Sequence, residues 1–458
     1  MSTNPMNKYF ALVASAIAFG ASVSAPAVAQ DGAKLDEIIV TARKREESLT
    51  DVPESIVAIS SETIVNQNMK TLDKIGMTIP NFNLNTRSDG YPNVTMRGMG
   101  AFSLTQGVGF YLDDVQLISD PSSRFGDLER IEVLKGPQGV LYGGNNIGGA
   151  VKFVSKRPSA DGVSGNVKVM AGQQNSMDVE ATINIPMSDE WAMRAFAYTR
   201  EDDGFMYNIT TQDDAIAAYE ERGGRIQIAG PLSDNVSLYA SARFNEWDGH
   251  NNNWVREKAG ISGNEFQYNY VSDIDSPSKS DKETTGLHLE VVWENDGFDM
   301  TYIGSYTDTE ADRPVDVDLV YELWYDATQR EEFETSTHEL RFASNTDSNL
   351  QWQAGLYAMT FEKAERSTST LGAWAGGPFT MRAAWYDSER EHVAAFGNVT
   401  YESGPWTIDF GLRADSWEQS LDMVDQELTG FVHSNSTDGT EVLPRLTISR
   451  RLENDSMV

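Results

Sequence analysis

The densest cluster of residues that could do chemistry is the glycine-rich run at 136–149, which reads GPQGVLYGGNNIGG and holds six glycines. Only glycine enters conformations with φ > 0 without steric cost, so such a run forms a tight turn or lies close against something. A phosphate-binding loop would end in Gly-Lys-Ser or Gly-Lys-Thr and open a helix, and neither feature is present. We therefore interpret the run as a turn between two strands, Leu128 to Leu134 and Ala150 to Ser155.

Other residue types that could act in catalysis or metal binding are absent or lack the needed spacing. The chain has no cysteine, which excludes disulfides and thiolate metal sites. No G-x-S-x-G signature of a nucleophile is present, and a formal net charge of −33 argues against nucleic-acid binding. The sequence therefore predicts a protein that is not an enzyme, with no catalytic residue, metal or cofactor. The histidines are scattered without ligand spacing: His250, His288, His338, His392 and His433.

The N-terminus has the pattern of a secretory signal peptide. Lys8 precedes an apolar, alanine-rich run from Tyr9 to about Val23, and the small residues Ala27-Val28-Ala29 form a cleavage site. Beyond residue 30 no apolar run of 18 residues exists, which excludes transmembrane helices. A β-barrel stays open as an interpretation, because its strands need only about ten alternating residues each.

After Pro158 the apolar pattern changes to a period of two, as in VEATINI at 179–185. A soluble sandwich would also alternate. From the second strand on, however, short turns alternate with long polar loops, which is typical of outer-membrane barrels. The long loops are expected at about 202–220, 247–282, 309–331, 363–389 and 417–439. About twelve strands are expected, near 164–172, 177–186, 190–201, 221–230, 235–246, 283–294, 297–308, 332–343, 350–362, 390–401, 405–416 and 440–452.

Three motifs together resemble the plug domain of TonB-dependent outer-membrane receptors. They are MRGMG at 96–100, GFYLDDVQL at 109–117, and RIEVLKGPQGVLYG with IGGAVKFVSKRP within 130–158. The resemblance covers the sequence from residue 36 onward. It implies a mainly β protein, with a small α+β plug domain inside an antiparallel transmembrane β-barrel. The family's second motif commonly has Gly where Asp114 stands, and we expect the hairpin to survive because Asp tolerates left-handed conformations.

The resemblance also implies a domain organisation. Residues 1–29 would be the signal peptide, 30–42 a periplasmic leader with the TonB box, 43–160 the plug, and 161–458 the N-terminal part of the barrel. Family barrels have about 22 strands, of which about 12 are expected here. The chain is therefore expected to be a C-terminally truncated fragment or gene product.

The β-branched segment after the leader resembles the TonB box, which TonB binds by strand addition while the inner-membrane ExbB-ExbD motor drives it. Its residues are Asp36, Glu37, Ile38, Ile39, Val40, Thr41 and Ala42. The alternative is an ordinary first strand of the plug. The charged residues that follow, Arg43 to Glu47, are interpreted as a solvated cluster.

Two arginines, Arg97 and Arg130, lie in otherwise apolar strands, and a buried arginine needs a carboxylate partner. The resemblance implies that they dock the plug onto glutamates of the barrel wall, and we expect these to be Glu339 and Glu290. Alternation in the segment 339–342 puts Glu339 on the lumen side. Surface exposure of the two arginines is the alternative.

The implied function is active uptake of a scarce large solute, by default a ferric siderophore, with cobalamin and oligosaccharides as alternatives. The receptor would be a monomer in the outer membrane of a Gram-negative bacterium, in contact with outer-membrane lipid. A passive porin-like channel, a hydrolytic enzyme and an inactive remnant are the competing hypotheses. Loop aromatics could stack on a ligand or merely pack the loops: Trp254, Tyr268, Tyr270, Trp324, Tyr325, Trp385 and Tyr386. Loop cations could attract an anionic siderophore, although acids surround them: Arg256, Lys258, Arg313, Arg330 and Arg382.

Overall fold

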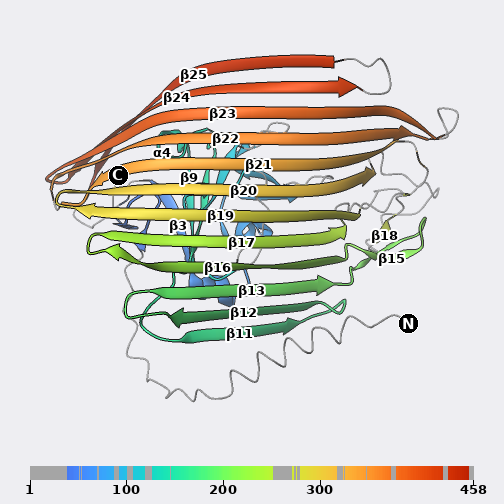
Figure 1. Ribbon diagram of the computed structural model, residues 1–458, viewed down its shortest axis with the longest axis horizontal. Helices are drawn as coiled ribbons and strands as arrows, with labels where there is room; N and C mark the ends of the chain where they lie inside the picture. The colour runs from blue at the N-terminus through green and yellow to red at the C-terminus, as the bar shows by residue number, and fades with distance from the viewer. Residues whose placement is uncertain are drawn as a thin grey trace. The chain divides into compact units, whose positions relative to one another are not determined.

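A computed structural model describes residues 39–452 apart from 51, 53, 70–71, 87–91, 101–106, 119–125, 145, 251–270, 273–274, 276–278, 317–322, 324, 347, 373–377 and 426–431. These residues belong to one compact unit, Ile39–Val458. The segment up to Ser155 folds as a small mixed domain, which we call the N-terminal globule (Figure 1). The segment from Ser164 forms a twelve-stranded antiparallel sheet, which we call the long sheet. The expected signal peptide lies outside the described residues.

The globule is organised around a five-stranded mixed sheet in the order β3-β9-β10-β7-β8. The central strand β10 pairs parallel with β7 and antiparallel with β9, and all seven of its residues are buried. Phe110, Ile131 and Phe153 fill the core with at most 1% exposure, because burial of large apolar side chains drives its collapse. The strands are β3 (Ser55–Ser60), β7 (Val108–Leu112), β8 (Val115–Gln116), β9 (Leu128–Lys135) and β10 (Gly149–Ser155).

Shorter elements complete the globule. Ser60 caps helix α2, because its hydroxyl accepts a hydrogen bond from the Thr63 backbone N–H at 3.4 Å. The β7–β8 hairpin is formed with φ of 49° at Asp113 and 69° at Asp114, which confirms that Asp tolerates this turn. The elements are β1 (Ile39–Val40), β2 (Glu47–Ser48), α2 (Ser61–Asn66), α3 (Leu72–Thr78), β4 (Phe82–Thr86), β5 (Pro92–Met96), β6 (Met99–Gly100) and α4 (Gly139–Tyr142).

One local expectation in the globule was wrong. The glycine-rich run is more than a turn, since it contains α4, whose Val140, Leu141 and Tyr142 side chains are buried. Burial of these three side chains favours the short helix over a plain hairpin. Within the described part of the chain, no helix has the length and apolarity needed to cross a membrane.

The long sheet contains all twelve predicted strands, each paired antiparallel with the next. From β19 on they are longer than expected, up to 25 residues in β23, so most of the predicted loops at 309–331 and 363–389 are strand. In 309–316 and 363–370 polar residues predominate on both faces, which hides the alternation in the sequence. The strands are β11 (Ser164–Ala171), β12 (Met177–Pro186), β13 (Ala192–Asp202), β16 (Tyr219–Ser233), β17 (Val236–His250), β19 (Lys279–Asn295), β20 (Phe298–Asp316), β21 (Tyr325–Ser344), β22 (Leu350–Leu371), β23 (Phe379–Ser403), β24 (Trp406–Asp425) and β25 (Val432–Arg450). Three short strands that fall between these in the sequence form a separate sheet: β14 (Met206–Asn208), β15 (Asp213–Ile216) and β18 (Val271–Ser272).

The two faces of the long sheet differ in polarity. On β24, Ile408, Phe410 and Leu412 are 41%, 49% and 44% exposed, whereas Asp409 and Arg413, on the opposite face, are 0% and 2% exposed. Helix α4 of the globule contacts β23, β24 and β25, and Figure 1 shows the globule behind the strands. The buried polar face, which we call the inner face, is therefore the one turned toward the globule. The exposed apolar face, which we call the outer face, reverses the pattern of a soluble sandwich.

Candidate functional site

The segment Thr41–Lys44, which we call the junction segment, touches both the globule and the long sheet. The globule holds Thr41, whose backbone N–H donates to Glu132 Oε1 at 2.8 Å. Lys152 Nζ donates to the Thr41 hydroxyl at 2.7 Å, and Arg130 Nη2 donates to it at 3.2 Å. Strands β9 and β10 thus fix this segment immediately after β1.

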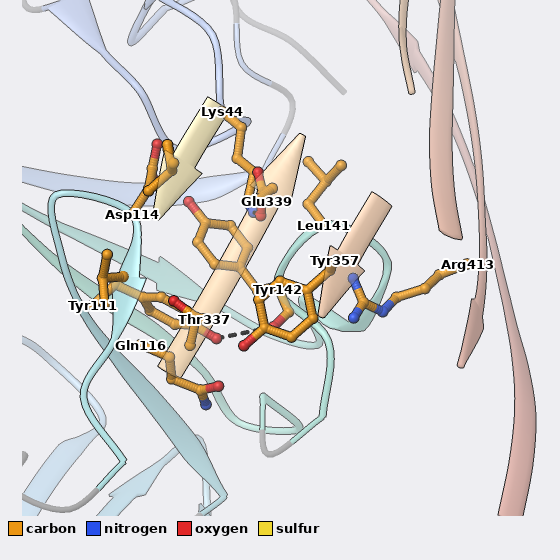
Figure 2. A pocket seen from close by; sticks show the side chains of 12 residues that line it. Lys44, Tyr111, Asp114, Gln116, Leu141, Tyr142, Thr337, Glu339, Tyr357 and Arg413 are labelled. Atoms are coloured by element: carbon orange, nitrogen blue, oxygen red, sulfur yellow. Dashed lines mark hydrogen bonds and ion pairs between the residues drawn. The ribbon is translucent and has the colours of Figure 1, made fainter. Parts of the chain in front are cut away.

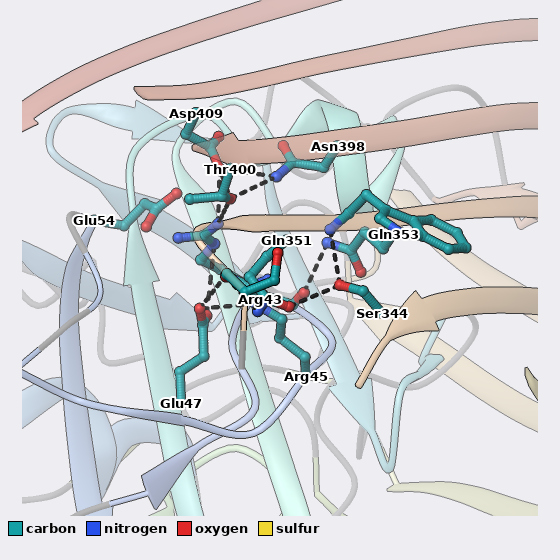
Figure 3. A network of polar contacts seen from close by, with 12 residues as sticks. Arg43, Arg45, Glu47, Glu54, Ser344, Gln351, Gln353, Asn398, Thr400 and Asp409 are labelled. Carbon is teal, nitrogen blue, oxygen red and sulfur yellow. Dashed lines mark hydrogen bonds and ion pairs between the residues drawn. The ribbon is translucent and has the colours of Figure 1, made fainter. Parts of the chain in front are cut away.

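Arg43 joins the junction segment to the inner face (Figure 3). Its Nη2 donates to Asp409 Oδ2 on β24 and to Thr400 Oγ1 on β23, both at 2.7 Å. Asp409 also accepts a hydrogen bond from Arg445 Nη2 at 2.6 Å. The side chains of Arg43 and Asp409 are 3% and 1% exposed. A buried ion pair needs such additional donors, because its charges have lost their water.

Lys44 makes a second contact with the inner face. Its Nζ pairs with Glu339 on β21, and Glu339 Oε1 accepts from Arg341 Nη1 at 3.1 Å. Arg341 Nη2 lies 3.6 Å from Asp114 Oδ2, and Asp114 Oδ1 lies 2.7 Å from Lys152 Nζ. Charges of opposite sign therefore alternate along this row of five residues, which offsets the cost of burying them.

Two members of this row have shifted acidities. Burial lowers the pKa of the Lys44 ammonium, and the attraction of Glu339 offsets this only in part. Burial alone would raise the pKa of Asp114, but Lys152 and Arg341 outweigh it and hold the pKa of that carboxyl below its usual range. Asp114 therefore stays ionised into the acidic range, whereas Lys44 holds its proton less firmly than a lysine in water.

A small cavity of about 20 Å³ lies between Lys44 and the inner face, lined also by Tyr357 and Arg413 (Figure 2). Its size suits one ordered water molecule, and a transported solute would not fit. Tyr111 Oη donates to the Tyr142 carbonyl at 3.0 Å, and Tyr142 Oη donates to the Ala42 carbonyl at 2.8 Å. Burial raises the pKa of both phenols, so they remain donors at neutral pH. Two tyrosines from the sequence motifs thus support the junction segment.

The expectation of a solvated charge cluster at Arg43 to Glu47 was wrong at its first two residues. Arg43 and Lys44 are 3% and 7% exposed, and their partners are Asp409 and Glu339. No local pattern marks these acids as partners, because they are about 300 or more residues away in the sequence. An acidic side chain within an otherwise apolar or neutral strand, as in 408–412, is the available signal.

The structure describes only the second part of the expected TonB box, from Ile39 onward. Asp36, Glu37 and Ile38 lie outside the described residues. Ile39 and Val40 form β1, which pairs antiparallel with β2. Val40 and Ala42 are 0% and 1% exposed, so the second half of the expected free segment is packed into the globule.

Three of the four expected docking residues have partners other than those expected, and the fourth, Arg97, is exposed. Arg130 Nε pairs with Glu132 Oε1 at 2.7 Å within the globule. Arg97 is exposed at a turn with φ of 52°, and within the described range it forms no ion pair. Glu339 pairs with Lys44, and Glu290 lies 3.0 Å from Arg157 Nη2. Both glutamates therefore contact cations that precede the long sheet, but the cations are Lys44 and Arg157.

The expected ligand aromatics are placed only in part. Tyr325 begins β21, where its hydroxyl lies 3.3 Å from Ser369 Oγ. Trp385 is 45% exposed and stacks on the Arg366 guanidinium at 5.2 Å. Tyr386 follows Trp385 in β23, so the two side chains point to opposite faces. Within the described residues, no group of three or more His, Asp or Glu side chains could hold a metal ion. Four expected residues lie outside the described range: Trp254, Tyr268, Tyr270 and Trp324.

Comparison with known families and relatives identifies part of this chain directly. Residues 48–150 match the family model of the TonB-dependent receptor plug domain. The ferrioxamine B receptor of Salmonella typhimurium (strain LT2) is 28% identical over 197 residues, which cover 39% of this chain and 28% of the relative. The iron-regulated outer membrane virulence protein of Vibrio cholerae (El Tor strain N16961) is 24% identical over 437 residues, covering 87% of this chain and 61% of the relative.

Solved structures share the fold. The ferric yersiniabactin uptake receptor FyuA from Yersinia pestis superposes with a TM-score of 0.79 at 18% identity, covering 88% of this chain and 62% of that one. The siderophore receptor PiuA from Acinetobacter baumannii gives 0.71 at 16% identity, covering 88% and 63%. This chain thus spans less than two thirds of the length of each of these proteins.

Proposed function

We propose that this chain, which belongs to the TonB-dependent outer-membrane receptors, takes up a ferric siderophore across the outer membrane of a Gram-negative bacterium. The observation that carries the proposal is the junction segment. It directly follows the expected TonB box and is bound at once to the globule and to the inner face of the long sheet. A force applied to the box would reach both contacts before any other part of the globule.

We assign the parts of the chain accordingly. The N-terminal globule, within residues 43–160, acts as the plug, and residues 161–458 form the N-terminal part of the barrel. Residues 1–29 act as the signal peptide and 30–42 as the periplasmic leader. The exposed apolar outer face supports contact with outer-membrane lipid, because a bilayer is the solvent in which such a face is stable.

The partner of the box is TonB, driven by ExbB and ExbD. Recognition by strand addition needs an extended segment with free backbone groups. Ile39 and Val40 are already extended in β1, but they are paired with β2. TonB can therefore bind the whole segment Asp36–Ala42 only after β1 separates from β2 and Val40 and Ala42 leave their buried sites. A ligand promotes this release only if it binds the released state more tightly.

The class of solute is proposed from the relatives, whose names refer to ferrioxamine and to ferric yersiniabactin. The family consists of receptors, so no catalytic step is assigned. The small cavity at Lys44 is too small for a ferric chelate. We place the solute on the far side of the globule, between its apices and the loops of the long sheet.

The test is uptake of radiolabelled ferric siderophores by cells that express the complete chain. Deletion of Asp36–Ala42, substitution Ile39→Pro and loss of TonB are each expected to abolish uptake, whereas Ile39→Val serves as the matched control and retains it. Ile39→Pro removes a backbone N–H and so blocks strand addition. Uptake that is unchanged by the deletion would contradict the proposal and favour a passive channel. Absence of the protein from the outer membrane would favour an inactive remnant.

A further inference from the structure

The inner face of β23 carries an arginine whose surroundings differ from those of the other arginines there. Strand residues alternate between faces, so Arg390 lies on the same face as Phe396 and Asn398. Phe396 packs in the apolar cluster that includes Tyr142 of the globule, and Asn398 Nδ2 donates to Asp409 in the network of Arg43. Arg390 is farther from the short turn at 403–406 than either residue. It therefore lies on the loop side of both of these contacts.

The hydrogen bonds of Arg390 leave part of its guanidinium unused. Nε and Nη2 both donate to Gln419 Oε1 on β24, at 3.3 and 2.7 Å. A guanidinium has five N–H donors, so the two on Nη1 and one on Nη2 remain. These are the donors that bind two oxygens of an anion side by side. Among the described residues, no carboxylate lies within ion-pair distance of Arg390.

Two other inner-face arginines are neutralised by carboxylates, whereas Arg225 donates to the backbone carbonyls of Gly126 and Asp127. Arg200 pairs with Asp178, Glu180 and Glu221. Arg413 Nε lies 2.9 Å from Asp415 Oδ1. The wall thus supplies carboxylates to Arg200 and Arg413 but, among the described residues, only a neutral amide to Arg390, so a positive charge remains at this place.

Aromatic side chains lie beside Arg390. Phe361 is directly opposite Arg390 in the register of β22 and β23. Trp417 is paired with His392, so it lies diagonally across from Arg390, within reach of a long side chain. Aromatic faces of this kind stack on planar groups, including aromatic rings.

We propose that Arg390, with Phe361 and Trp417, forms a binding subsite for an anionic ferric chelate whose ligating groups are planar and carry paired oxygens, as catecholates and aryl carboxylates do. The inference rests on the proposed function and names the charge class of its solute. The chain as a whole carries a formal charge of −33 and repels anions at a distance. A local positive charge is therefore needed to hold an anion here.

The test compares two probes of similar size and different charge on the purified complete chain in lipid vesicles. A ferric tris-catecholate is anionic, whereas a ferric tris-hydroxamate built on a neutral backbone has no net charge. Binding is followed by quenching of tryptophan fluorescence. Arg390→Gln is expected to weaken binding of the catecholate roughly tenfold to a hundredfold, as loss of a charge-assisted bidentate contact does, and to leave the hydroxamate unchanged. Arg390→Lys keeps the charge but loses the planar pair of N–H donors, so the affinity for the catecholate is expected to fall by an intermediate factor of roughly threefold to tenfold.

The matched control is Arg222→Gln on β16. Arg222 is on the outer face, 64% exposed, and its guanidinium pairs with Glu246. This variant is expected to bind both probes as the parent does. Equal weakening of both probes by Arg390→Gln, no weakening of either, or failure of the parent to bind the catecholate would overturn the inference. TonB-dependent uptake of the neutral chelate by Arg390→Gln cells would then still support the proposed function, whereas loss of all uptake in the parent would contradict that function.

Discussion

The N-terminal globule and the long sheet bury opposite kinds of side chain. In the globule, Phe110 and Phe153 are at most 1% exposed, as in a water-soluble domain. In the long sheet, Asp409 is fully buried while its neighbour Phe410 is 49% exposed. The globule is therefore stabilised by its own apolar core. Its contact with the sheet, which we call the seat, combines the buried ion pairs of Arg43 and Lys44 with the apolar cluster that includes Tyr142 and Phe396. The globule can leave this seat without exposing the core around Phe110 and Phe153.

The largest expected effect follows from the apolar half of this comparison. Phe153→Ala removes a fully buried ring from β10, and we expect a loss of about 3–5 kcal/mol in the free energy of unfolding of the globule. This loss is measured by denaturant titration of the complete chain in vesicles, with the protease sensitivity of the globule as the readout. Phe410→Ala on the outer face is the control, and its loss is expected to be below about 1 kcal/mol, because lipid replaces the contacts of the ring. Equal losses would contradict the contrast between the two regions.

The buried charges between the globule and the long sheet predict a smaller effect, which is confined to the contact between these two regions. Glu339→Gln keeps the size of the side chain but removes the charge that faces Lys44 and Arg341. We expect the free energy that holds the globule against the long sheet to fall by about 1.5–3 kcal/mol, since hydrogen bonds to charged groups are of that order. The globule itself should unfold as in the parent, because its core does not include Glu339.

Thiol labelling measures seating directly, because the chain has no cysteine. With Ala42→Cys as the only thiol, the parent is expected to label slowly, since Ala42 is 1% exposed. Adding Glu339→Gln should speed labelling by more than tenfold. Glu402→Gln, at an exposed side chain near the end of β23, should leave the rate unchanged. An unchanged rate with Glu339→Gln would show that Lys44 does not hold the segment.

The strands of the long sheet were predictable from the sequence, and the seat was not. Alternation as in VEATINI is a local signal, and it placed all twelve strands. It failed at the loop ends of β20 and β22, where polar residues predominate on both faces and no apolar period marks the strand. The pairing of Arg43 with Asp409 depends on how a plug packs against a sheet, which no local pattern records. For the same reason the motifs indicated Glu339 as a docking residue but not its partner Lys44.

Acid is expected to loosen the seat before it unfolds the globule. Lys152 and Arg341 hold the pKa of Asp114 below its usual range, against the effect of burial. A carboxyl with a lowered pKa in the folded state contributes stability above its unfolded pKa of about 3.9 and loses that contribution as the pH falls further. Labelling of Ala42→Cys, with a reagent that reacts at low pH, should therefore accelerate below about pH 4. Asp114→Asn should remove this acceleration and label faster at neutral pH, and an acceleration that persists would assign it to another group.

The smallest expected effect concerns a row of acids on the outer face for which no cation lies within ion-pair distance in the described part of the chain. Asp308, Glu334, Glu362 and Glu389 are direct cross-strand neighbours on four successive strands. Like charges directly opposite each other are destabilising, and an opposite charge contributes roughly 0.2–1 kcal/mol. Glu334→Lys is thus expected to stabilise the long sheet by that amount, in contrast to the loss at Glu339, five residues along the same strand. Because the row is exposed, 1 M salt should erase most of the gain, whereas it should leave the buried pair of Lys44 and Glu339 nearly intact. A gain that persists in high salt would mean that the row is shielded from water as the seat is, and the contrast between the two faces would then rest on apolar side chains alone.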